Sequence, residues 1–73
     1  MSPKFERYTN INEIEIFTLD ENIATLSSDN SAIVMQIWPN FIMIIDKDKN
    51  KSNIYMNEYI TEIQIKGELQ IGE

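Results

Sequence analysis

Cysteine and histidine are both absent from this chain of 73 residues. A core of this size supplies only about 3–5 kcal/mol of net stability, and small folds commonly add disulfides or a structural zinc ion. Both of these need side chains that the chain lacks. We therefore expect residues 1–73 to fold as a single domain by hydrophobic packing, with self-association into a homo-oligomer as a further source of stability.

The C-terminal segment shows the clearest local pattern. From Tyr59 to Ile71 the odd positions are mostly apolar and the even positions, after Ile60, are polar. This period of two is typical of a half-buried β-strand. Gly67 lies in the apolar series, where a glycine indicates a bulge, a sharp bend or a turn between two shorter strands.

The centre of the chain is apolar on both faces. Residues 33–38 and 41–46 flank Pro39 and Asn40, a pair that favours a turn, so we predict a hairpin here. A helix over residues 31–38 is the alternative, but the β-branched side chains and the following proline favour a strand. In so short a chain, one of the two apolar faces should lie in an interface, for which Met43 and Ile44 are the candidates.

The remaining segments complete an all-β prediction. Residues 13–19 and 23–27 form a second expected hairpin, residues 28–31 a turn, and residues 52–56 another strand. About six short strands separated by turns predict a small antiparallel barrel or sandwich. Ser2 and Pro3 are compatible with one additional helical turn at the N-terminus, extending to Glu6 or Tyr8.

The charge distribution points to a basic partner. The net charge is −6, and no Lys or Arg occurs from Tyr8 to Ile45. A surface of this kind attracts basic surfaces, although a solvated strand face would have the same composition. The candidate partner-binding acids share this cation-free stretch: Glu13, Glu15, Asp20, Glu21 and Asp29.

Two other features are ambiguous or weak as sites. Trp38 lies beside the central turn, where it could anchor an interface or close the end of a barrel. Residues 46–52 alternate acids with lysines, but Lys51 stands where a calcium loop needs glycine and Asn57 where it needs a bidentate Glu. We therefore expect no metal site and no cofactor.

The function expected from these features is binding without catalysis. The sequence lacks a His, a Cys nucleophile and a glycine-rich phosphate loop, and the negative charge disfavours direct nucleic-acid contact. By composition the chain is similar to acidic phage-type inhibitors and nucleic-acid mimics that dock on a basic surface of another protein. The alternatives are an immunity or antitoxin protein, or a homo-oligomeric β-barrel structural or sensing module with a small-molecule or peptide pocket.

The longest apolar run is far shorter than the roughly 20 residues of a membrane span, so we expect a cytoplasmic protein without membrane contact.

Overall fold

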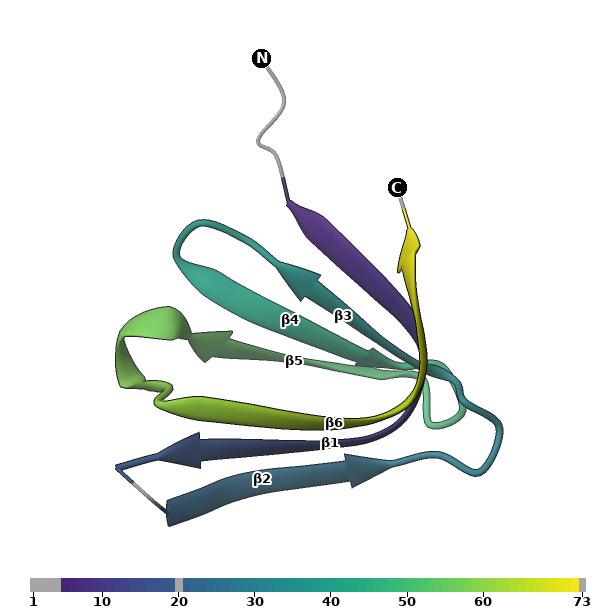
Figure 1. Cartoon of the computed structure of the whole chain (residues 1–73), viewed down its shortest axis with the longest axis horizontal. Coiled ribbons are helices and arrows are strands. Elements are labelled where there is room, and N and C mark those ends of the chain that lie inside the picture. Colours follow the sequence, from purple (N-terminus) through teal and green to yellow (C-terminus); the bar gives the residue numbers. More distant parts are fainter. Residues whose placement is uncertain (1–4, 20, 73) are drawn as a thin grey trace.

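A computed structural model describes residues 5–19 and 21–72. Six antiparallel strands form one curled sheet, a half-barrel, and a single 3-10 turn is the one helical element among the described residues (Figure 1). The elements are β1 (Glu6–Thr18), β2 (Glu21–Ser27), β3 (Ile33–Ile37), β4 (Phe41–Asp46), β5 (Lys51–Met56), η1 (Asn57–Tyr59) and β6 (Glu62–Gly72). The all-β prediction is therefore confirmed.

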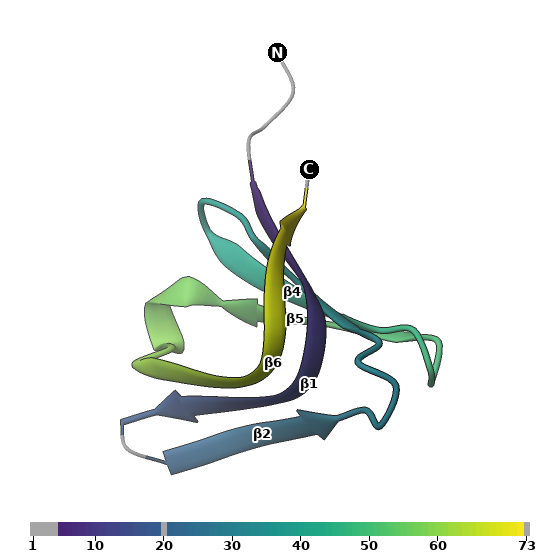
Figure 2. The same cartoon turned by 45° about the vertical axis from the view of Figure 1, so that its right-hand side comes forward.

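The long first strand organises the sheet. The C-terminal half of β1 pairs with β2, its N-terminal half pairs with β3, and β6 pairs along both halves. Strands β4 and β5 extend the sheet beyond β3. Two arms result, which meet at a bend shared by β1 and β6 (Figures 1 and 2).

The bend has a local cause in both strands. Asn10 of β1 has a φ of 60° and Gly67 of β6 has a φ of 139°, and the register between the two strands shifts around them. Asparagine tolerates the left-handed region, and glycine has no Cβ to exclude it from such angles. Gly67 therefore marks a bend inside one continuous strand, which is one of the options expected from the sequence.

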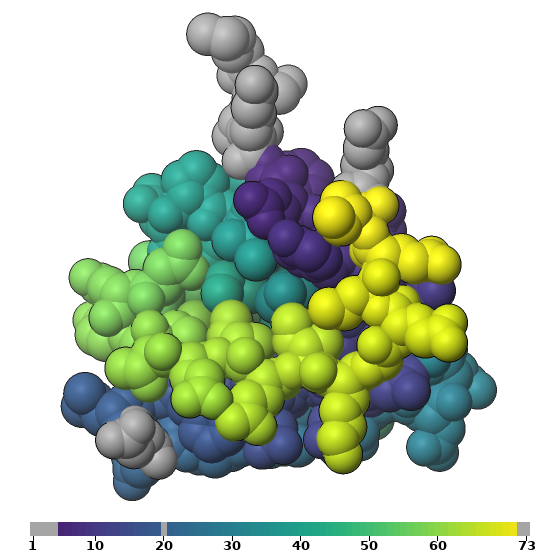
Figure 3. Space-filling model, in the orientation of Figure 1, coloured from purple at the N-terminus to yellow at the C-terminus, as the bar shows by residue number. Residues whose placement is uncertain are grey.

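One core fills the space between the arms. Ile14 and Ile16 of β1 pair with Leu26 and Ala24 of β2 on one side and with Ile65 and Ile63 of β6 on the other. These side chains meet the inward side chains of β3 and β4 in a single cluster. Its buried members are Ile11, Ile14, Ile16, Ile33, Met35, Ile42 and Ile44. In Figure 3, β6 lies across the front of this packed body.

The start of the chain departs from the sequence-based expectation. The helical turn extending to Glu6 or Tyr8 is wrong, because β1 already begins at Glu6 and pairs there with Ile37 of β3. Ser2 and Pro3 lie outside the described residues. Pairing on both edges of β1 holds this polar segment in a strand. The helical alternative for residues 31–38 is wrong as well, since β3 occupies this segment.

No helix long and apolar enough to cross a membrane occurs in residues 5–19 and 21–72.

Candidate interaction surfaces

The outer side of the arm made by β2, β1 and β6 is acidic. Because Ile14 and Ile16 point into the core, Glu13 and Glu15 point outward. Glu62 joins them, since it pairs with Phe17, the next outward position of β1. We call Glu13, Glu15 and Glu62 the acidic face.

Neutral amides hold two of these carboxylates. Nδ2 of Asn22 donates a hydrogen bond to Oε2 of Glu15 at 3.0 Å, and Nε2 of Gln64 donates to Oε2 of Glu62 at 2.6 Å. Such bonds orient a carboxylate without cancelling its charge. Glu13 differs, because Lys66 of β6 is its cross-strand partner. The acidic face therefore keeps a negative balance, partly offset at the Glu13 end.

The other predicted acids lie at the two ends of β2. Glu21 is exposed at the start of β2, opposite Thr18, which lies on the inward side of β1 next to the outward Phe17, so Glu21 is not part of the acidic face. Asp29 is exposed in the loop after β2, at the opposite end of the strand. Asp20 lies outside the described residues. The structure thus brings Glu13 and Glu15 together and separates Asp29 from them.

The outer side of the other arm is apolar. Outward positions alternate with the buried Ile42 and Ile44 of β4, and cross-strand pairing aligns them in rows across β3, β4 and β5. One row ends in the pair Met43 and Ile54, and the next in Phe41 and Met56. We call this set the apolar face: Phe5, Trp38, Phe41, Met43, Ile45, Ile54 and Met56. Val34, which pairs with Ile45, has the same orientation but is only 3% exposed.

A row of stacked aromatic rings crosses the apolar face. The rings of Phe5 and Trp38 have centroids 4.2 Å apart, and those of Trp38 and Phe41 are 5.6 Å apart, both nearly parallel. Nε1 of Trp38 donates a hydrogen bond to Oε1 of Gln36 at 3.0 Å. Trp38 thus lies half-buried on the outer side of the sheet, where an interface anchor would be placed.

Met43 and Ile44 have different positions. Met43 is half-buried on the apolar face, where another molecule can reach it. Ile44 has no exposed surface and packs within the core. Ile44 therefore belongs to the folding of the chain, and Met43 is the member of the pair that a partner can touch.

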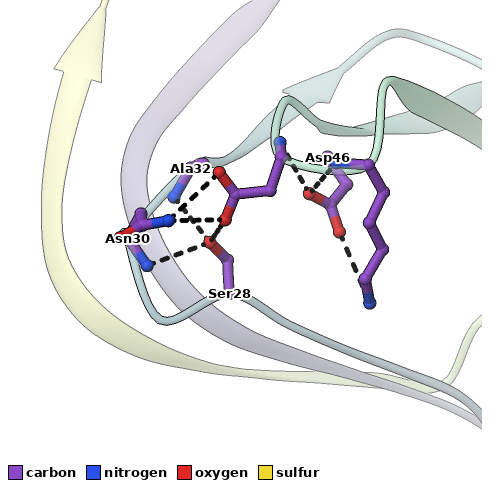
Figure 4. Close-up of polar contacts among 6 residues, drawn as sticks. Ser28, Asn30, Ala32 and Asp46 are labelled. Atoms are coloured by element: carbon purple, nitrogen blue, oxygen red, sulfur yellow. Dashed lines mark hydrogen bonds and ion pairs between the residues drawn. The ribbon is translucent and has the colours of Figure 1, made fainter.

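The acids of the β4–β5 turn have structural partners (Figure 4). Oδ1 of the buried Asp46 accepts hydrogen bonds from the backbone N–H groups of Asp48 and Lys49 at 3.1 and 3.3 Å. The Asp48 carboxylate accepts hydrogen bonds from Ser28 and Asn30 in the β2–β3 loop. These contacts tie two loops together. In residues 5–19 and 21–72, no group of three or more candidate metal-binding acids is found.

The two faces point away from each other. Both arms direct their inner sides at one shared core, so the acidic face and the apolar face lie on opposite sides of the molecule (Figure 1). The candidate residues predicted from the sequence therefore form two surfaces instead of one.

Comparison with known proteins gives no relative for this arrangement. The sequence matches no protein-family model, and no curated protein or solved structure shows a significant similarity to it.

Proposed function

We propose that this protein acts without catalysis, by binding a basic surface of another protein through its acidic face. The observation that carries the proposal is the placement of Glu13, Glu15 and Glu62 on three adjacent rows of one strand-built surface. Carboxylates fixed on strands are presented at defined spacing, which favours complementary contact and fast encounter with a cationic partner. An inhibitor that covers the functional site of a basic protein would work in this way.

The density of charge favours docking on a protein over extended imitation of a nucleic acid. Glu13 and Glu15 are two residues apart on β1, which corresponds to about 6.8 Å along a strand. Duplex DNA carries one charge per roughly 1.7 Å of its axis. In addition, Lys66 offsets part of the charge beside Glu13. A compact basic patch is therefore a better complement than a long nucleic-acid groove.

A charge-reversal pair tests the proposal. The bait variant Glu13→Lys with Glu15→Lys removes the central charges of the acidic face. The control variant Glu58→Lys with Glu68→Lys changes the net charge by the same amount at exposed positions outside it. Proteins captured from a cell lysate by the wild-type chain are compared with those captured by both variants. We expect the specific partner to be basic, and to be lost with the first variant but kept with the control.

Association rates then separate steering from simple adhesion. Exposed charges are screened beyond about 8 Å at physiological ionic strength, so the association rate of the captured partner should fall steeply as salt rises. Reversal at Glu13 and Glu15 should lower that rate more than it raises the dissociation rate. Equal losses from both variants, or a rate independent of salt, would show that the acidic face is only a solvated surface.

A further inference from the structure

Three large side chains of the apolar face are exposed. Ile54 is 58% exposed, Met56 is 45% exposed and Phe5 is 39% exposed, and all three adjoin half-buried apolar neighbours. Contiguous apolar surface of this kind marks a contact with another macromolecule. The stacked ring of Trp38 at its centre is the type of side chain that dominates such contacts.

The charges around the apolar face select its occupant. In the rows of described residues that make up this face, Arg7, opposite Gln36, is the one charged residue. The chain as a whole carries a net charge of −6, so two copies repel each other through most of their surface. The apolar face is where they can meet without opposing carboxylates. A basic partner would instead be drawn to the acidic face on the other side.

The two margins of the apolar face carry opposite charges. Arg7 lies on β1 at one margin, and the exposed Glu58 follows Met56 of β5 at the other. If two copies pack face to face about a two-fold axis parallel to the strands, β1 of one copy lies over β5 of the other. This axis keeps positions along the strands, so Arg7, which shares a row with Met43 and Ile54, lies over Ile54 of the second copy, and the symmetry repeats the contact. Glu58 lies beyond the next row, at the end of the face.

We propose that a second copy of this chain covers the apolar face, giving a two-fold dimer with an acidic face on each outer side. This proposal does not depend on what the acidic face binds.

The size of the apolar face places the expected dimer among weak interfaces. Four strands about 4.8 Å apart, with six residues rising about 3.3 Å each, give a flat area of about 380 Å² per copy. Stable interfaces bury about 800 Å² per partner. Protruding side chains add surface to the flat estimate, but the interface stays at the small end. We therefore expect dissociation constants in the micromolar range.

Molar mass against concentration tests the dimer. In sedimentation equilibrium from about 1 to about 500 µM, which brackets micromolar dissociation constants, the wild-type mass should rise from 8.6 kDa toward twice that value. Ile54→Lys should remain monomeric throughout. Ile23→Lys is the matched control, because Ile23 is 48% exposed on β2, away from the apolar face, and this variant should dimerise as the wild type does.

The outcomes decide between alternatives. Circular dichroism verifies that Ile54→Lys is folded, and Met56→Lys replaces it if it is not. A wild-type chain that stays monomeric at the highest concentration overturns the proposal, as does an Ile54→Lys or Met56→Lys chain that dimerises normally. Loss of the dimer in Ile23→Lys would place the interface on the other arm. Arg7→Glu places a carboxylate over the apolar Ile54 of the second copy and should weaken the dimer; an Arg7→Glu chain that dimerises as the wild type does refutes the proposed axis.

Discussion

Gly67 should be the least replaceable residue of the bend. A Cβ added at this position would lie 2.6 Å from the backbone oxygen of Asn10 and 2.9 Å from the backbone nitrogen of Asn12. Both atoms belong to the neighbouring strand, so no side-chain rotation can relieve the overlap. The φ of 139° adds conformational strain for any residue with a Cβ.

The magnitude of the effect follows from these two terms. Strain in a backbone region reserved for glycine costs about 1–3 kcal/mol. Overpacking against fixed atoms costs about another 1–3 kcal/mol. A core of this size provides only about 3–5 kcal/mol in total. Gly67→Ala should therefore lose half or more of the free energy of unfolding, and part of the population should be unfolded in water.

Urea unfolding measures this directly. The fluorescence of Trp38, the single tryptophan, and far-ultraviolet circular dichroism both report on the transition. Gln70→Ala, an exposed change in the same strand, is the control and should shift the free energy by no more than about 0.5 kcal/mol. If Gly67→Ala unfolds at the same urea concentration as this control, the argument from the bend is refuted.

Three further predictions concern the core, the β4–β5 turn and the phenol of Tyr8. Ile44→Ala should lower the free energy of unfolding, measured in urea, by about 2–5 kcal/mol because the side chain is fully buried. Met43→Ala should lower it clearly less. Equal losses would contradict the assignment of Ile44 to the core and Met43 to the apolar face. Asp46→Ala should cost about 1–3 kcal/mol because two backbone N–H groups lose their acceptor, and Asp46→Asn, which keeps an acceptor oxygen, should cost less. The hydrogen bond from Tyr8 to Glu6, followed by desolvation and the charge of Glu6, raises the pKa of Tyr8 above its ordinary value of 10.0. The hydrogen bond therefore stabilises the fold below pH 10.0, and this stabilisation is lost as the pH rises through the higher pKa of Tyr8 in the folded chain. An absorbance titration should show a lower pKa for Tyr8 in Glu6→Gln than in the wild type.

The sequence predicts the elements whose signals are local. The strand at residues 41–46 is confirmed with both of its ends, because an apolar run lies between a Pro-Asn turn and a charged turn. The hairpin of β1 and β2 is also confirmed, although its turn is shorter than expected. The first seven residues of β1 carry no such pattern. They are held in a strand by β3 and β6, which are distant in the sequence.

The candidate surfaces depend on information that is not local. Period two places Glu13 and Glu15 on one side of a strand, and the structure agrees. Glu62 joins the acidic face only through the register of β6 against β1. The acidic and apolar faces lie on opposite sides of the molecule because of the bend at Asn10 and Gly67. In β4 both faces are apolar, so the sequence offers no reason to choose Ile44 over Met43 as the buried residue.

The pairing of β1 with β6 also has a consequence for how the chain folds. Tyr8 and Ile71 are register partners, although roughly sixty residues separate them, and β6 covers one whole edge of β1. Contacts between such distant segments are slow to form, because a large loop must close before they stabilise anything. We therefore expect folding in milliseconds to seconds. Until β6 docks, the paired β1–β2 hairpin keeps an open hydrogen-bonding edge, and this is the stage at which the chain is most exposed to strand addition by other chains.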